Sequence, residues 1–463
     1  MKIKVKNLGV LKQAEFTLGD LTIICGGNNT GKTYATYALY GFLSTWQEFL
    51  SIDISSNKIE QLLTDGVIHL DLQEYVEKID QIVAQACQLY TKQLPKVFAS
   101  QAEQFKVTKF EAILDLNSIT FPDNIGIETK YKLGIIDFLS ITKSPGSTKT
   151  IITLLIDKEK LSIPINIIKE MIISNMKDII FLPLFPRPFI ASAERTGSAI
   201  FRKELNFSRN RLLEEIWQAD ASIDPRELLF KNYEDYALPI KQNVSFNQQL
   251  ENVVKKSSFI AENHPDILAD FADIIGGEYK VTQNDQLYYQ PKGKRIKLSM
   301  DESSSGVRSL LDIGFYLKHE AEVGDLLMVD EPELNLHPEN QRRVARLFAR
   351  LVNLGIKVFI TTHSNYIIKE LNTLIMLNHD QPHLKRIAEE EGYRAEELIS
   401  AEKIKVYIAE KASIILEGQT KKTKCQTLTP ADIDPEMGIE ARSFDKTIET
   451  MNRIQEAIVW GKD

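Results

Sequence analysis

A glycine-rich loop followed by a lysine and a threonine is the first group of residues that could do chemistry. Residues 26–33 read GGNNTGKT and fit the pattern G-x-x-x-x-G-K-[ST], in which backbone N–H groups cradle phosphates. Lys32 would place a positive charge at the β- and γ-phosphates of ATP, and Thr33 would offer its hydroxyl to Mg²⁺. The other residues expected to bind ATP in this loop are Gly26, Gly27, Asn28, Asn29, Thr30 and Gly31.

Two adjacent carboxylates could supply the metal ligand and the base that such a loop needs. Residues 325–338 read DLLMVDEPELNLHP, in which an apolar run leads into Asp330 and Glu331. Ligands bind at the carboxyl ends of strands in open α/β sheets. Asp330 would therefore hold Mg²⁺, and Glu331 would polarise the attacking water. The alternative is an acidic turn that ends a strand, which the Lys32 loop disfavours.

A histidine ends a second apolar run. Residues 357–366 read KVFITTHSNY, and the run before His363 predicts another strand. A lone histidine there is more often structural. If its strand neighbours that of Asp330, however, His363 can reach the γ-phosphate or the attacking water.

A serine-rich turn precedes an amphipathic segment. Residues 302–317 read ESSSGVRSLLDIGFYL, and its serines are suitable N-caps for a helix. Capping serines and free N–H groups at the start of a helix can also bind an anion. Ser304 and Gly306 are therefore candidate phosphate contacts.

These motifs need strands and helices that bring them together. Residues 21–25 (LTIIC) are apolar throughout and predict a buried strand before the loop, and a helix should run from Lys32 to about residue 50. From residue 325 onward, strand and helix patterns alternate, which predicts a parallel α/β arrangement.

The middle of the chain shows other periodicities. Residues 57–97 have helical spacing, and 104–160 alternate as antiparallel strands do. Residues 245–275 predict one long helix, and the segment after it predicts a hairpin.

Composition limits the class of protein. The chain has 463 residues and a net charge of -8, which gives no overall attraction to nucleic acid or to anionic membranes, although a local basic patch can exist. The three cysteines lie far apart without metal-ligand spacing, so we expect reduced thiols in a cytoplasmic protein. The most apolar run, 179–191, contains three prolines and is too short to cross a bilayer.

The four motifs, in this order, resemble those of the ABC-type ATPase family. SSSGVRSL (303–310) resembles the family's signature sequence, although Ser305 stands where a glycine is usual. ELNLHP (333–338) and TTHS (361–364) are similar to the branch that contains RecF-like and OLD-like proteins. The resemblance implies an α/β fold: an ABC-type P-loop ATPase head, with a mixed sheet core, an antiparallel β-subdomain and helical insertions. It also implies ATP and Mg²⁺ as cofactors.

The resemblance implies that ATP lies between two subunits arranged head to tail. Ser304 and Gly306 of one subunit would face the P-loop of the other, and Asn335 would cross the interface from the segment that matches the family's D-loop. ASAERTG (191–197) is similar to an arginine-bearing motif of small standalone members, which implies that Arg195 contacts ATP. Copies would form head-to-tail dimers, or a larger ring such as a hexamer.

Length and motif content separate the branches of this family. A transporter subunit would need a membrane partner, and a Rad50- or SMC-like protein needs a coiled coil longer than this chain can hold. An OLD-type protein carries a fused Toprim nuclease with a D-x-D metal site. After His363 the D-x-D pattern occurs at Asp432 and Asp434, where Pro430, Pro435 and a glycine indicate a turn.

The remaining resemblance is to a standalone ATPase that works with a separate effector. ASAERTGSAIFRKEL (191–205) and GIEARSFDKTIETMNRIQEAI (438–458) are similar to the AriA-type ATPase of the PARIS antiphage system. The resemblance implies a sensor that holds a Toprim-type nuclease, AriB-like, until a phage-encoded trigger protein releases it. Other defence ATPases, such as the PtuA type, stay open.

Two further functions remain as alternatives. A RecF/SMC-like DNA-binding clamp in DNA repair requires a basic strip, for which PKGKRIK (291–297) and TKKTK (420–424) are candidates. Solvated hairpin tips explain these residues equally well. An ATP-dependent scaffold without hydrolysis is disfavoured by Glu331.

We expect five segments along the chain, each with one part in this architecture. They are the start of the ATPase core with the P-loop (1–44), a helical and antiparallel β insertion (45–180), an arginine-motif segment with a helical lobe and hairpin (181–299), the part of the core with the signature, Asp330, Glu331 and His363 (300–385), and a C-terminal α/β tail (386–463).

Overall fold

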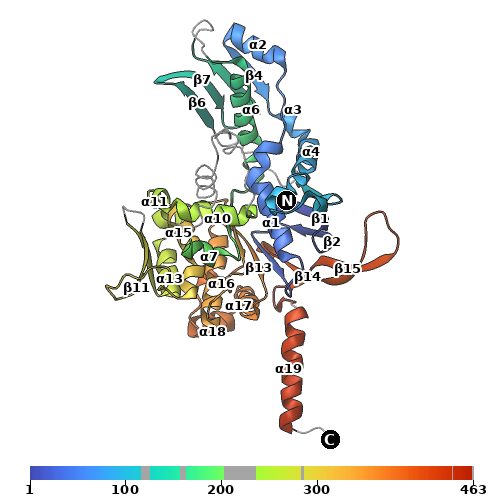
Figure 1. Ribbon diagram of the computed structural model, residues 1–463, viewed down its shortest axis with the longest axis vertical. Helices are drawn as coiled ribbons and strands as arrows, with labels where there is room; N and C mark the ends of the chain where they lie inside the picture. The colour runs from blue at the N-terminus through green and yellow to red at the C-terminus, as the bar shows by residue number, and fades with distance from the viewer. Residues whose placement is uncertain (116–125, 157–162, 203–235, 283–285, 441, 461–463) are drawn as a thin grey trace, which may run out of the picture. The chain divides into compact units, whose positions relative to one another are not determined.

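The chain packs into two compact units. The computed structural model describes residues 1–115, 126–156, 163–202, 236–282, 286–440 and 442–460. The smaller unit comprises Met1–Lys4, Phe42–Lys92 and Lys109–Arg187, and the larger comprises Val5–Gly41, Gln93–Thr108 and Pro188–Asp463. Figure 1 labels their helices and strands in chain order.

A six-stranded mixed sheet forms the centre of the larger unit, in the order β15-β14-β3-β13-β12-β9. The first pair is antiparallel and all the other pairs are parallel. β3 and β12 are buried along their whole length, as expected for strands covered on both faces. The strands are β3 (Leu21–Cys25), β9 (Pro188–Ala191), β12 (Leu326–Asp330), β13 (Lys357–Thr362), β14 (Ile404–Ile415) and β15 (Lys422–Pro430).

The register of the parallel strands determines where their polar ends lie. Thr362 at the end of β13 pairs with Cys25 at the end of β3, and Thr361 pairs with Asp330 at the end of β12. β9 runs parallel on the other side of β12. The loops that follow these four strands therefore leave the same edge of the sheet.

Helices and small sheets complete the larger unit. α1 begins in this unit immediately after the glycine-rich loop, and α16 and α17 follow β12 and β13 (Figure 1). The helices are α1 (Lys32–Phe49), α5 (Leu94–Val97), α7 (Arg195–Ile200), α10 (Leu238–Gln248), α11 (Leu250–Val253), α12 (Phe259–Asn263), α13 (Pro265–Ile275), α14 (Ser305–Ser309), α15 (Leu311–His319), α16 (Pro338–Asn353), α17 (Asn365–Met376), α18 (Pro382–Glu390) and α19 (Arg442–Trp460). Its other strands are β1 (Lys2–Leu8), β2 (Leu11–Thr17), β10 (Gly277–Val281), β11 (Leu287–Pro291), β16 (Ile433–Asp434) and β17 (Gly438–Ile439).

The long helix expected over 245–275 is wrong. Four helices, from α10 to α13, cover 238–275. Ser258 starts α12, because its side chain accepts a hydrogen bond from the Ala261 N–H. His264 leaves the helical region (φ -135°, ψ 55°) because the following Pro265 disfavours helical backbone before it. The hairpin expected after this segment is confirmed as β10 and β11.

An antiparallel sheet in the order β4-β8-β7-β6 characterises the smaller unit, and it confirms the strands expected within 104–160. Its elements are α2 (Ser56–Asp65), β4 (Val67–Asp71), α3 (Gln73–Val76), α4 (Ile79–Thr91), β5 (Lys109–Ile113), β6 (Ile127–Leu133), β7 (Ile136–Lys143), β8 (Lys149–Leu154) and α6 (Ile165–Phe181). The continuous helical pattern expected over 57–97 is wrong at β4. Gly66 ends α2 at a φ of 74°, and the chain then pairs with β8.

The predicted fold class is confirmed: the chain is mixed α/β, with a mixed core sheet and a separate antiparallel sheet. Of the expected segment 181–299, residues 203–235 lie outside the described part. In the part of the chain that the structure describes, no helix is both long and apolar enough to span a bilayer.

Candidate nucleotide-binding site

The loop between β3 and α1 depends on glycine at two positions. Gly26 has a φ of 144°, and a Cβ there would lie 2.7 Å from the Ala409 carbonyl oxygen of β14. Gly31 has a φ of 98°, and a Cβ there would lie 2.7 Å from the Leu11 side chain. Close packing and left-handed backbone both exclude larger residues, so the neighbouring strands shape this loop.

Lys32 folds back over the same loop. Its Nζ donates hydrogen bonds to the carbonyl oxygens of Gly26 (3.1 Å) and Gly27 (2.8 Å). The Thr30 hydroxyl also donates to the Gly27 carbonyl at 2.8 Å, and Gln426 of β15 donates to the Thr30 carbonyl at 3.1 Å. The ammonium has three N–H donors, so two of them fix it above the loop and one is left for a phosphate.

Thr33 and Asp330 meet at the carboxyl end of β12. The Thr33 hydroxyl donates to Asp330 Oδ2 at 3.4 Å, and the Thr361 hydroxyl donates to Asp330 Oδ1. Burial raises the pKa of Asp330 to about 6, against the lowering effect of the Thr361 hydrogen bond. A hydroxyl beside a carboxylate is an oxygen donor pair that Mg²⁺ accepts, and a cation would offset the cost of burying the charge. The residues present therefore fit Mg²⁺.

Glu331 has a strained backbone that its neighbours hold in place. Its φ is 52°, which costs a non-glycine residue about 1 kcal/mol or more. Its N–H donates to the Thr361 carbonyl at 3.1 Å and lies 3.2 Å from the Thr361 hydroxyl, and its own carbonyl accepts from Arg195 at 2.8 Å. A strained backbone that hydrogen bonds on both its N–H and its carbonyl hold in place is typical of a residue with a functional side chain.

His363 lies between two carboxylates. Its Nδ1 is 3.5 Å from Glu331 Oε1 and 3.3 Å from Glu333 Oε1. Glu333 Oε1 also accepts from the Thr362 hydroxyl at 2.9 Å and from the His363 N–H at 2.7 Å. The structure thus places His363 beside Glu331, on the strand that neighbours that of Asp330.

Glu333 and Thr361 are site residues that the sequence reasoning missed. Glu333 is buried, and in the described chain its Oε2 has no hydrogen-bond partner. Thr361 binds Asp330 and Glu331 at once. An acid two residues after Glu331 and a threonine two before His363 were visible signals, but their contacts depend on the register of β12 with β13.

Arg195 makes contacts within the chain that the sequence did not predict. Its side chain is 1% exposed and donates to four backbone carbonyls, which are Ser192 (2.8 Å), Ser309 (2.6 Å), Asp330 (2.6 Å) and Glu331 (2.8 Å). Four of its five N–H donors are therefore occupied within the chain. Arg195 therefore ties the end of α14 to the backbone of Asp330 and Glu331. This is a positioning role within the chain, whereas the resemblance implied contact with ATP.

The signature residues lie on a separate, exposed turn. Ser304 caps α14, and its hydroxyl accepts a hydrogen bond from the Val307 N–H at 3.3 Å. A Cβ on Gly306 would lie 3.0 Å from the Asn335 carbonyl oxygen, so this turn packs against the exposed Asn335, whose φ is 59°. Among the described residues, no hydrogen bond joins this turn to the Lys32 loop.

A buried carboxylate follows the signature turn. Asp312 is 1% exposed, and Asn247 Nδ2 donates to its Oδ1 at 2.9 Å. Its Oδ2 has no hydrogen-bond partner in the described part of the chain. Burial raises the pKa of Asp312 to about 7, although Asn247 and the charge of Arg195 lower it.

Asp312→Asn should raise the free energy of unfolding by on the order of 1–3 kcal/mol more at pH 8 than at pH 5. The folded-state pKa lies above the ordinary value of 3.8, so the folded protein binds an extra proton between these values. The contribution of this extra proton to the free energy of unfolding is complete below about pH 4 and is lost as the pH rises through 7. Urea unfolding at both pH values measures this, with the exposed Asp80→Asn as control. An equal effect at both pH values would contradict it.

Asp434 ends β16, and the turn that the sequence predicted follows it at residues 435–437. Asp434 Oδ1 accepts from the backbone N–H groups of Glu436 (2.8 Å) and Met437 (2.9 Å). Within the described ranges, no three His, Cys, Asp or Glu side chains gather in a way that could hold a metal ion.

Comparison with known proteins identifies the family. Residues 1–368 match the model described as an AAA ATPase domain. The chain belongs to the AAA ATPase domain family. No curated protein matches this AAA ATPase in sequence.

Solved structures similar to this AAA ATPase include two SMC heads. The SMC head domain from Thermotoga maritima is 9% identical, with 93% of this chain and 98% of that chain covered and a TM-score of 0.31. The Smc head with an extended coiled coil bound to the C-terminal domain of ScpA, derived from Pyrococcus furiosus, is 13% identical, with 98% of each chain covered and a TM-score of 0.32. The family assignment rests on the 1–368 match alone.

Proposed function

We propose that the protein binds and hydrolyses ATP in ABC-type composite sites between two copies arranged head to tail. The observation that supports this proposal is that one chain holds two separate groups of residues, each of which would form half of such a site. The first half-site is Lys32, Thr33, Asp330, Glu331 and His363 at one edge of the sheet, and the second is Ser304, Gly306 and Asn335 on an exposed turn.

Each residue of the first half-site has a distinct task. Lys32 would donate its remaining N–H to the phosphates, and Glu331 would take the proton of the water that attacks the γ-phosphorus. His363 would hold the Glu331 carboxylate, since its Nδ1 lies 3.5 Å away. Mg²⁺, held by Thr33 and Asp330, would neutralise charge on the phosphates.

Mixing two inactive variants tests the composite site. Lys32→Ala disables the loop, and Ser304→Arg disables the signature turn, so neither variant alone should turn over ATP. If the sites are shared, a mixed pair contains one intact site of two, and an equimolar mixture should recover roughly a quarter of the wild-type rate. Phosphate release from the mixture measures this. An affinity tag on one variant shows whether mixed pairs have formed. If mixed pairs form and the mixture still does not turn over ATP, the proposal is contradicted.

We infer as a biological role that this ATPase is a defence sensor that holds a separate Toprim-type nuclease and releases it on a phage trigger. The resemblances at 191–205 and 438–458 support this role. Exposed apolar side chains of α19, namely Met451, Ile454, Ile458 and Trp460, also suit contact with another protein. Co-purification with the product of an adjacent nuclease gene, lost on addition of phage lysate, is the test. A complex that never forms would refute the role without touching the ATPase.

A RecF/SMC-like DNA-binding clamp is the second candidate. Residues 292–297 and 420–422 are exposed and rich in lysine and arginine, which is compatible with phosphate contacts. DNA binding that ATP strengthens and that weakens steeply with salt would favour this candidate over the sensor.

A further inference from the structure

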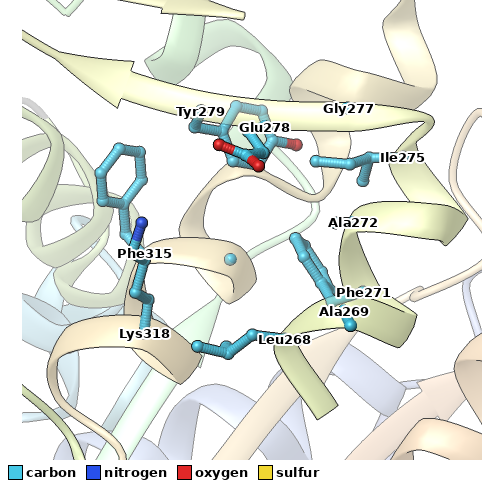
Figure 2. Close-up of a pocket in the computed structure, with 11 residues that line it drawn as sticks. Leu268, Ala269, Phe271, Ala272, Ile275, Gly277, Glu278, Tyr279, Phe315 and Lys318 are labelled. Carbon is cyan, nitrogen blue, oxygen red and sulfur yellow. The ribbon is translucent and has the colours of Figure 1, made fainter. Parts of the chain in front are cut away.

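A hollow with apolar walls lies behind the signature turn, outside the ATP site. Figure 2 shows it between α13, β10 and α15, with Phe271, Tyr279 and Phe315 among the side chains that line it. Its volume is about 240 Å³. The remaining lining residues are Leu268, Ala269, Ala272, Ile275, Gly277, Glu278, Gly314 and Lys318.

A second hollow adjoins the first along β10. It has a volume of about 330 Å³ and shares Ala269, Ala272, Gly277 and Glu278 with the first. The second hollow is also lined by Gln290 and Pro291 of β11. We call the two adjoining hollows together the trough. Two adjoining hollows suit an extended chain better than a compact small molecule.

The strand beside the trough has an unpaired edge. β10 pairs with β11, and in the described chain it pairs with no other strand. The Lys292 N–H donates to the Gly276 carbonyl, and the Thr282 N–H donates to the Gln286 carbonyl. Residues 276 and 282 therefore belong to hydrogen-bonded pairs, and the residues between them alternate in the direction of their backbone groups. The N–H and C=O groups of residues 277, 279 and 281 therefore point away from β11. Gly277 is buried, so Tyr279 and Val281 form the accessible part of this edge. Such an edge accepts an added strand.

One charge at the trough lacks a partner. Two nearby lysines are paired: Lys280 Nζ lies 3.6 Å from Glu278 Oε2, and Lys292 Nζ lies 2.5 Å from Asp273 Oδ1. The backbone carbonyl of Lys318 accepts from the Ser258 N–H at 3.3 Å. Its exposed side-chain ammonium forms no ion pair or hydrogen bond with any described residue. The trough therefore favours an occupant that carries an acidic group near its apolar side chain.

We propose that this trough docks an extended segment of a partner protein. The segment would pair with the outer edge of β10, place a large apolar side chain in the hollow, and bring an acidic residue to Lys318. Because alternate residues of a strand share a face, the acid should stand two positions from the apolar residue. A second copy of β10 does not fit, since the Tyr279 side chain is held in its own chain by its hydrogen bond to the Val307 carbonyl.

The same hydrogen bond connects the trough to the signature turn. Val307 belongs to α14, whose N-cap is Ser304, and Tyr279 lines the hollow. An occupied hollow would fix Tyr279 and hence α14. This step rests on the proposed function, because it changes ATP turnover only if Ser304 serves a composite site.

The experiment selects ten-residue peptides from a phage-displayed random library on the full-length protein. Val281→Pro is the counter-selection, because it removes an N–H of the outer edge and leaves the bonds to β11 in place. Selected peptides should share a large apolar residue and an acid two positions apart. Fluorescence polarisation with a labelled selected peptide should show about tenfold weaker binding to Val281→Pro and to Lys318→Glu. The same peptide with lysine in place of its acid should regain affinity for Lys318→Glu.

Each outcome decides the proposal. A library that yields no peptide, peptides without this pattern, or equal affinity for Val281→Pro overturns it. Self-association that Val281→Pro abolishes, with no peptide selected, assigns the edge to a second copy and also overturns it. The charge-swap rescue excludes misfolding as the cause of weaker binding. Because binding is read without ATP, failure of the composite ATP site would leave these results unaffected.

Discussion

Glu331→Gln should lower the rate of ATP turnover about a hundredfold or more and leave ATP binding intact. Glutamine preserves the shape of the side chain, and the strained backbone at φ 52° stays fixed by Thr361 and Arg195. The amide cannot take a proton from water, so hydrolysis stops after ATP has bound. Phosphate release at saturating ATP measures the loss. Gel filtration with ATP should show a larger oligomer that persists.

A matched glutamate provides the control for this experiment. Glu339 on α16 is exposed and pairs with Arg342 at 3.1 Å, so Glu339→Gln should leave turnover unchanged. If Glu331→Gln retained turnover within a fewfold of wild type, Glu331 could not be the base. An oligomer that dissociates at the wild-type rate would mean that hydrolysis does not control assembly.

Arg195→Met should lower the free energy of unfolding by about 3–5 kcal/mol, the loss expected when a buried charged group is removed from its partners. Methionine fills part of the space but leaves four buried carbonyls without their donor. Arg195→Lys should recover a minority of the loss, since an ammonium cannot match the planar fork. Urea unfolding at pH 7 measures both variants.

An exposed arginine separates this effect from a general effect of charge. Arg386 on α18 is exposed and lies 3.8 Å from Glu390, so Arg386→Met should change stability by roughly 0–1 kcal/mol. If the free energy of unfolding of Arg195→Met lay within 1 kcal/mol of the wild-type value, the four hydrogen bonds would contribute little to stability. Both variants keep Glu331. If ATP turnover falls in Arg195→Met and not in Arg386→Met, the loss is due to the displacement of Asp330 and Glu331, which Arg195 positions.

The residues proposed to touch phosphate or water were identified from the sequence, and those that position them were not. Lys32, Asp330 and His363 each follow an apolar run, so their place at a sheet edge follows from local pattern. Thr361 binds the Asp330 side chain because β12 and β13 pair in one register, which no single segment shows. Arg195 was assigned to ATP by resemblance, but its burial is decided by tertiary packing.

The same distinction explains the helices and strands. β3 and α1 were predicted because a wholly buried strand and a phosphate loop have strong local signals. β4 was read as helix because its five residues are exposed and buried in turn between helical patterns, and only pairing with β8 reveals them as a strand. α12 and α13 were merged because their apolar spacing outweighed the break before Pro265.

The hairpin of β14 and β15 touches the Lys32 loop at two points, with the Ala409 carbonyl against Gly26 and Gln426 against Thr30. These strands lie beyond residue 368, where the family match ends. This hairpin is consequently a wall of the phosphate loop and not an appendage to it. Anything that pulls on the hairpin, whether a bound protein or a cut in the chain, acts directly on the loop proposed to hold the triphosphate.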